Sequence, residues 1–216
     1  VMAAWFHDLI EAFVHCHSRH VVVRQLHPDQ VIVDGSGVAK LSGLYRSTVL
    51  SDEDRRNPPN PVKAARAARK LEKEEKKKRK RKGDDGNLDN IFVAPEILLG
   101  SPVYSRESDI WMLGCVFANI LLNKPLFVGK ERSALLAAQF KVVGTVGPEN
   151  YAEAKGFPLF KNPAKKYKVG VEKALTHLLL KARDGDNSLA IDLICKMLRL
   201  DPKERCSAAE AAQHEF

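Results

Sequence analysis

Apolar residues recur at intervals of three and four across residues 2–19, which predicts an amphipathic helix. The apolar positions of this helix are Met2, Trp5, Phe6, Leu9, Ile10, Phe13 and Cys16. Short β-branched runs follow at residues 21–23, 31–33 and 38–41, and each predicts a small strand. The turn Gly35-Ser36-Gly37 is expected to join the last two strands into a hairpin.

Helical periodicity returns in the second half of the chain and predicts five further helices. Their expected bounds are 107–122, 131–143, 171–181, 188–199 and 207–214. Ser108 and Asp109 are capping candidates for the first of these, because short polar side chains accept the free backbone N–H groups of a helix start. Residues 145–170 are rich in Gly, Pro and Lys, so we expect a loop there.

Length and composition favour one folded domain without a membrane span. The chain has 216 residues, of which 44% are hydrophobic, and this is enough for one core. No apolar run reaches the roughly 18 residues that a spanning helix needs, and no secretory signal is visible at the first residues. The four cysteines are scattered without metal-ligand or disulfide spacing, which favours buried thiols in a reducing compartment.

The net charge of +8 comes from one segment, a basic low-complexity insert at residues 52–87. Residues 63–82 hold twelve Lys or Arg and three Glu, a local charge of +9, so the remainder carries about −1. Leu71 is the only large apolar residue between Lys63 and Lys82. A segment of this composition buries too little surface to offset its ordering entropy.

Five motifs occur in a fixed order along the chain. They are V-R-Q-L-H-P-D-Q-V-I-V-D at Val23–Asp34, A-P-E at Ala94–Glu96, S-D-I-W-M-L-G-C at Ser108–Cys115, K-P-L-F-V-G-K at Lys124–Lys130 and D-P-K-E-R-C-S-A at Asp201–Ala208. In this order they resemble the landmarks of the large, C-terminal lobe of eukaryotic protein kinases. The Lys124–Lys130 motif places the resemblance closest to the cyclin-dependent and MAP kinase group.

The resemblance implies a mainly α-helical fold with small β hairpins, a protein-kinase-like large lobe spanning residues 1–216. No glycine-rich phosphate loop, V-A-I-K strand or helix with the partner glutamate is recognisable. The small lobe is therefore expected to be absent, with the basic insert placed in the activation segment.

The family's working residues are replaced in the segment that resembles the catalytic loop. Arg24 is kept, but the aspartate base falls on Gln25, the lysine on His27 and the metal-binding asparagine on Gln30. An amide has no basic site at neutral pH, and a general base typically contributes about 10²–10⁴-fold to the rate. The resemblance thus implies a degenerate catalytic site.

The metal-binding D-F-G motif is missing as well. Gly43 stands at its position, and no Asp or Glu occurs from Gly35 to Leu50. Magnesium prefers hard oxygen ligands, usually one or two carboxylates with phosphate oxygens. No metal site and no cofactor are therefore predicted; ATP and magnesium are expected only if the chain is an active kinase.

Residues that hold the family's large lobe together are kept. Asp109 matches the aspartate that accepts backbone N–H groups from the catalytic loop, and His17 falls where the family commonly has a structural histidine. Glu96 and Arg205 match the ion pair between the activation segment and the late helices. Intact architecture with degenerate chemistry is typical of a pseudokinase.

Three functional hypotheses follow. The first is a catalytically impaired pseudokinase that binds proteins, and the second is an active serine/threonine kinase represented by a fragment. The third is a nucleic-acid-associated protein that works through the basic insert, where a solvated loop or a localisation signal is the competing explanation. The candidate signal consists of Lys76, Lys77, Lys78, Arg79, Lys80, Arg81 and Lys82. Protein partners and a nuclear rather than cytoplasmic location are expected, with no membrane association.

Overall fold

The computed structural model describes residues 2–50, 91–101, 103–161, 166–168, 170–180 and 187–216. The helices are α1 Met2–Ser18, α4 Pro95–Leu98, α5 Arg106–Leu122, α6 Arg132–Val143, α7 Val171–Leu180, α8 Ser188–Met197 and α9 Ala208–Ala212. The strands are β1 Val21–Val22, β2 Val31–Val33, β3 Ala39–Leu41 and β4 Thr48–Val49, and the 3₁₀ turns are η1 Pro28–Gln30, η2 Leu44–Arg46, η3 Ala152–Gly156 and η4 Pro202–Glu204. The basic insert at 52–87 lies outside the described residues.

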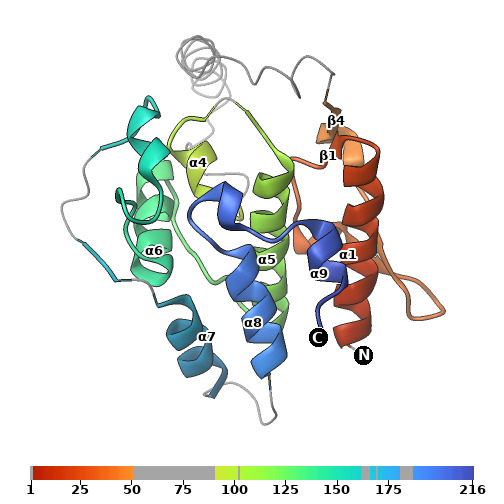
Figure 1. Ribbon diagram of the computed structural model, residues 1–216. Coiled ribbons are helices and arrows are strands. Elements are labelled where there is room, and N and C mark those ends of the chain that lie inside the picture. Colours follow the sequence, from red (N-terminus) through yellow and green to blue (C-terminus); the bar gives the residue numbers. More distant parts are fainter. Residues whose placement is uncertain (1, 51–90, 102, 162–165, 169, 181–186) are drawn as a thin grey trace.

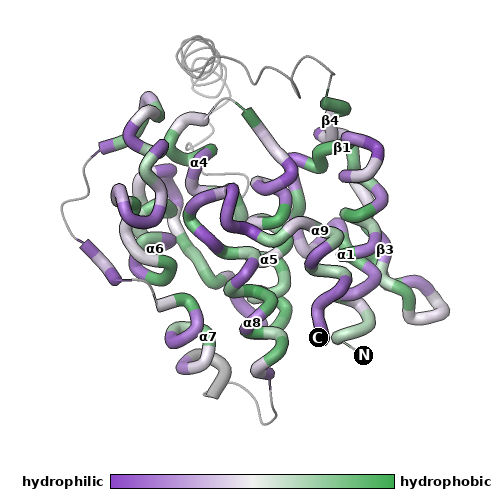
Figure 2. The backbone as a smooth tube through the Cα atoms, viewed as in Figure 1, coloured by the Kyte–Doolittle hydropathy of each residue, from purple (hydrophilic) through white to green (hydrophobic). Residues whose placement is uncertain are grey.

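Helix α5 runs through the centre of the molecule, with α8 beside it, α1 and α9 on one side and α6 and α7 on the other (Figure 1). Most of its residues are buried, including Trp111 and Phe117, which are fully enclosed. A helix that is apolar on nearly every face belongs in a core. Figure 2 accordingly shows hydrophobic stretches along α5 and α8.

The amphipathic first helix is confirmed as α1, and its apolar face packs on α5. The ring of Phe6 stacks on that of Phe117 with centroids 3.9 Å apart, and the ring of Phe216 lies 5.5 Å from Phe6 on a tilted plane. Trp5, one of the apolar positions, also makes a polar contact, because its indole N–H donates to the carbonyl of Gly37 over 2.9 Å. This bond ties the turn of the β2–β3 hairpin to α1.

The predicted hairpin at Gly35–Gly37 is confirmed, with β2 and β3 antiparallel and Val31 opposite Leu41. The second sheet was not predicted: β1 pairs with β4, with Val21 opposite Val49. These two strands are separated by the whole β2–β3 hairpin, so they form an antiparallel pair but not a hairpin. The strand predicted at residues 21–23 is thus confirmed as β1.

The predicted helix bounds agree with the structure to within two residues, but the predicted cap of α5 is wrong. Its N-cap is Ser105, whose side chain accepts from the backbone N–H of Ser108. Ser108 completes a capping box from inside the first turn. Asp109 is occupied elsewhere, as described below. In the stretch 145–170, expected to be a loop, the 3₁₀ turn η3 is a short ordered element.

Among the described residues, no helix is long and apolar enough to cross a membrane.

Candidate functional site

Asp109 organises the segment that precedes the β2–β3 hairpin. Its carboxylate, fully buried in the first turn of α5, accepts the backbone N–H of Val23 at 2.7 Å and that of Arg24 at 2.8 Å. The Nε2 atom of His17 lies 3.0 Å from the same carboxylate. Arg24 adopts a left-handed backbone with φ of 66°, a conformation that costs a non-glycine residue free energy. The two bonds to Asp109 hold this turn in place.

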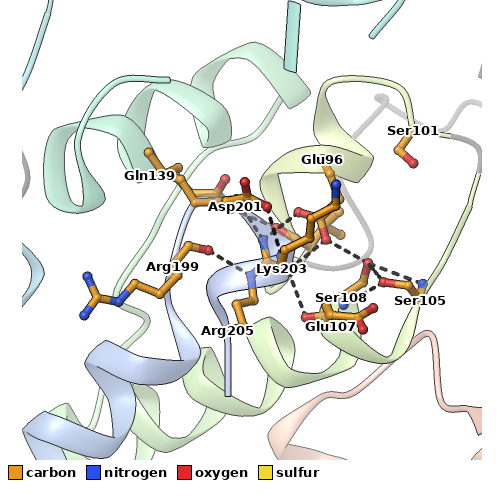
Figure 3. Close-up of polar contacts among 12 residues, drawn as sticks. Glu96, Ser101, Ser105, Glu107, Ser108, Gln139, Arg199, Asp201, Lys203 and Arg205 are labelled. Carbon is orange, nitrogen blue, oxygen red and sulfur yellow. Dashed lines mark hydrogen bonds and ion pairs between the residues drawn. The ribbon is translucent and has the colours of Figure 1, made fainter. Parts of the chain in front are cut away.

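Glu96 and Arg205 form a buried ion pair at the base of the site (Figure 3). The guanidinium donates to both carboxylate oxygens at 2.8 and 2.7 Å, and the Ser108 hydroxyl donates to one of them at 2.8 Å. Arg205 also donates to the backbone carbonyl of Glu107 and lies over the ring of Trp111 at 5.0 Å. This bidentate pair joins α4, α5 and the segment after η4.

His27 caps the turn that carries Gln30. Its Nδ1 accepts from the backbone N–H of Asp29 at 3.3 Å and lies 3.0 Å from the Asp29 carboxylate. The ring of His27 meets that of Phe92 edge to face, with centroids 5.7 Å apart. The position that the family resemblance assigns to a phosphoryl-contacting lysine thus holds a capping side chain.

Gln30 ties this turn to the turn around Gly43. Its Oε1 accepts the N–H of His27 at 2.8 Å, and its Nε2 donates to the carbonyl of Gly43 at 3.1 Å. The backbone carbonyl of Gln30 accepts both the N–H and the hydroxyl of Ser42, at 2.8 and 3.0 Å. Both ends of the Gln30 amide are therefore engaged with the backbone.

Gly43 and Gln30 fit each other closely. Gly43 has φ of 71°, and a Cβ added there would lie 2.6 Å from Nε2 of Gln30. Real Cβ atoms essentially never approach so closely, so any side chain at this position would have to displace the Gln30 amide. The contact explains why a residue without a side chain occupies position 43.

The residues at these two positions do not fit a magnesium ion. Gly43 offers no side-chain oxygen, and the only side-chain oxygen of Gln30 already accepts a backbone N–H group. Within the described residues, no cluster of three or more His, Cys, Asp or Glu side chains has the geometry of a metal site. No step through a bound metal follows from this donor set.

A cavity of about 330 Å³ opens beside the degenerate loop. It is lined by Arg24, Gln25, Tyr45, Arg46, Ser47, Val93 and Tyr104. The guanidinium of Arg24 lies 4.8 Å from the centroid of the Tyr104 ring. Oε1 of Gln25 is buried and has no hydrogen-bond partner among the described residues. The cavity therefore combines positive charge, aromatic surface and one unused polar atom.

Electrostatics around the site follow from burial and pairing. Burial raises the pKa of the Tyr104 phenol, although the nearby Arg24 charge acts in the opposite direction. On the hairpin, the Lys40 ammonium lies 2.7 Å from the Asp34 carboxylate and, with the Ser36 hydroxyl, holds the pKa of that carboxyl far below its usual range. Tyr104 therefore stays neutral in the cavity at physiological pH, whereas Asp34 is ionised.

The structure brings the candidate positions into two groups. Arg24, Gln25, His27, Gln30 and Gly43 lie in adjoining turns of one loop region. The three scaffold residues lie beneath it, namely Glu96, Asp109 and Arg205. The candidate localisation signal Lys76–Lys82 lies outside the described residues.

Sequence reasoning missed the aromatic and basic residues of the cavity. Tyr45 and Arg46 belong to the short turn η2, and Tyr104 precedes α5. No spacing links Tyr104 to Arg24, because they are far apart in the chain and meet only in the fold. The one available signal was the absence of acidic residues from Gly35 to Leu50.

Comparison with known proteins gives one consistent family. The family model "Protein kinase domain" matches residues 1–216. Cyclin-dependent kinase 2 from Caenorhabditis elegans is 29% identical over 209 residues, covering 97% of this chain and 48% of the relative. Cyclin-dependent kinase C-1 from Oryza sativa subsp. japonica is 27% identical over 216 residues, covering 97% of this chain and 34% of the relative.

A solved structure shares the fold. A chain in the structure of the CAK complex from Chaetomium thermophilum bound to ATP-gamma-S aligns with a TM-score of 0.76 at 22% identity, covering 99% of this chain and 57% of that chain. The present chain thus spans from about a third to somewhat over half of the proteins that it matches. Absence of a small lobe from the whole protein stays a prediction.

Proposed function

The chain belongs to the protein kinase family, and on that premise we propose that it is a kinase-like module that binds proteins without transferring phosphate. The observation that carries the proposal is the Gln30 bridge. The Oε1 atom of Gln30 accepts the backbone N–H of His27, and its Nε2 atom donates to the carbonyl of Gly43. The family resemblance expects metal ligands at positions 30 and 43. Internal hydrogen bonds close the loop, and the residues at positions 30 and 43 supply no carboxylate for a cation.

The position of the base supports the same proposal. Gln25 lines the cavity with an amide, and its Oε1 is buried. An amide oxygen accepts a hydrogen bond but does not take a proton near neutral pH, so the general-base contribution is lost. The base and the metal ligands have different roles in the same chemical step, and the loss of either impairs phosphoryl transfer.

The intact scaffold supports a binding role. The Glu96–Arg205 pair and the Asp109 bonds maintain the loop and α4 in a defined arrangement. Two relatives are named cyclin-dependent kinases, and the similar solved structure is of a complex. We infer that the partner of this chain is likewise a protein that docks on the folded lobe.

An active serine/threonine kinase remains the alternative, favoured by the names of the relatives and by the ATP-gamma-S in the similar structure. The decisive experiment measures transfer of labelled phosphate from ATP with magnesium to a serine/threonine peptide array. We expect no transfer above background from the chain, or from the longer protein if the gene encodes residues before Val1. Transfer that disappears in Gln25→Ala would overturn the proposal, since it would assign chemistry to this loop.

We also propose that Lys76–Lys82 acts as a nuclear address, on the basis of the +9 charge concentrated in residues 63–82. Deleting residues 60–87 is expected to move a tagged protein out of the nucleus while leaving the denaturant midpoint nearly unchanged. An unchanged location after deletion would contradict the address. Loss of folding would contradict the view that the insert is separate from the core.

A further inference from the structure

The cavity beside Gln25 is basic, and its positive charge has no carboxylate partner in the described part of the chain. Its lining includes Arg24 and Arg46 but no carboxylate. Neither arginine forms an ion pair with any described residue; each instead lies near a tyrosine ring, Arg24 at 4.8 Å from Tyr104 and Arg46 at 6.0 Å from Tyr45. Two guanidinium groups without acidic partners on one rim attract an anion, above all a phosphate.

The same cavity offers a stacking surface. The side chain of Tyr45 is 75% exposed, an unusual fraction for an aromatic residue on a folded domain. Tyr104 supplies a second ring, partly buried under Arg24. Aromatic faces beside arginine are the platforms on which unpaired bases stack.

Gln25 adds a polar group that needs a partner. Gln25 lines the cavity, and its Oε1 is buried and accepts no hydrogen bond from the described residues. A side-chain amide can accept from and donate to the edge of a base. A ligand with a hydrogen-bond donor at this point would satisfy the orphaned atom.

We propose that this cavity binds one nucleotide of a single-stranded nucleic acid, with the base on Tyr45, the phosphates on Arg24 and Arg46, and the amide of Gln25 at the edge of the base. The volume of about 330 Å³ lies at the small end of the range for ligand pockets and suits one nucleotide. A duplex keeps its bases stacked inside, so it presents none to Tyr45. The site lies entirely within described residues and does not rest on the absence of phosphotransfer.

A phosphorylated peptide is the competing ligand, because it would use the same two arginines. A phosphorylated peptide offers nothing that stacks on the exposed ring of Tyr45, whereas an unpaired base stacks on it. The exposed ring of Tyr45 therefore decides for nucleic acid.

The test is fluorescence anisotropy of the full chain with fluorescein-labelled oligonucleotides of ten uridines and of ten deoxythymidines. Because residues 63–82 bind polyanions through charge alone, the informative quantity is the change caused by single substitutions. Tyr45→Ala is expected to weaken binding about 5- to 100-fold, the usual effect of removing one stacking ring. Tyr45→Phe keeps the ring and is expected to bind like the unchanged chain.

Arg46→Ala should weaken binding and lower the slope of log affinity against log salt by about 0.7, the value for one phosphate of a single strand. Arg199→Ala, which removes an exposed arginine of the segment after α8, is the matched control and should change the affinity far less than Arg46→Ala. Denaturant midpoints of all variants check that folding is kept.

Three outcomes overturn the proposal. The first is equal binding by Tyr45→Ala and the unchanged chain, or no binding by either, which would leave Tyr45 without a stacking role. The second is tighter binding of a ten-base-pair duplex than of either single strand. The third is binding of a phosphoserine peptide that depends on Arg46 while both oligonucleotides fail to bind. A Tyr45-dependent preference for either single strand supports it.

Discussion

The region around Glu96 and Arg205 and the region around Gln30 and Gly43 hold their polar side chains in opposite ways. Around Glu96 and Arg205 the side chains are charged, at most 4% exposed, and paired bidentately. Around Gln30 and Gly43 the polar side chain is a neutral amide on an accessible loop, and it bonds to the backbone. The first region is held by paired charges, while the second is held by neutral hydrogen bonds.

The difference shows which features of the family the stability of the folded chain can maintain without help from catalysis. A buried pair is costly to break, because the surviving charge has no water to solvate it. A metal-binding carboxylate on a loop has no such protection, since in an unliganded protein it only adds repulsion and strain. Folding stability therefore accounts for the buried pair, whereas it places no requirement for a carboxylate at position 43.

Breaking the buried pair is expected to have the most severe consequence. Arg205→Ala leaves the Glu96 carboxylate buried without a counter-charge, and such losses typically cost about 3–5 kcal/mol of unfolding free energy. Glu96→Ala should have a similar effect through the stranded guanidinium. Denaturant midpoints of the purified variants measure both.

Matched controls come from an exposed pair and from the loop. Lys203 and Glu153 lie 2.5 Å apart with side chains 72% and 65% exposed, so Lys203→Ala should destabilise the chain far less than Arg205→Ala. Gln25→Ala should likewise cost far less than Arg205→Ala. Equal losses at all three positions would mean that burial does not separate the two regions.

The fit between Gly43 and Gln30 can be measured by a double-mutant cycle. Gly43→Ala forces a side chain into left-handed backbone, at about 1–2 kcal/mol, and drives its Cβ against Nε2 of Gln30. In a Gln30→Ala background the steric part disappears, so the two losses should be non-additive by about 1 kcal/mol. Unfolding free energies of the two single variants and the double variant give the coupling.

Gly37 provides the control for this cycle. It also has a left-handed backbone, with φ of 86°, but a Cβ added there meets nothing within 4 Å. Gly37→Ala therefore reports the backbone cost alone and should show no coupling to Gln30→Ala. Additive losses for Gly43 and Gln30 would indicate that the loop relaxes freely around a new side chain.

Periodicity was enough to place α1, and a polar start followed by a long apolar run placed α5. It could not find α4, which has only four residues, or the pairing of β1 with β4, whose partners are separated by an entire hairpin. Gln30 and Gly43 were each recognised from the sequence as departures from a family pattern. That they touch each other is a property of the fold alone.

The exposed cluster at the end of α8 tests whether pairing without burial matters. Asp192 accepts from Lys196 at 2.7 Å and from His214 at 2.8 Å, and these two bonds hold the pKa of its carboxyl below the ordinary value, about 3.9. A depressed pKa means that the bonds stabilise the folded chain above that value and that the contribution is lost as the pH falls through the folded-state pKa. Because the Asp192 side chain is 54% exposed, solvent screening limits the effect to less than about 1 kcal/mol.

The variant Asp192→Asn should therefore be slightly less stable than the unchanged chain near neutral pH and equally stable in strong acid. Denaturant midpoints measured under both conditions check this expectation. A deficit that persists in acid would show that Asp192 acts through packing, and a deficit as large as that of Arg205→Ala would remove burial as the cause of the contrast between the two regions.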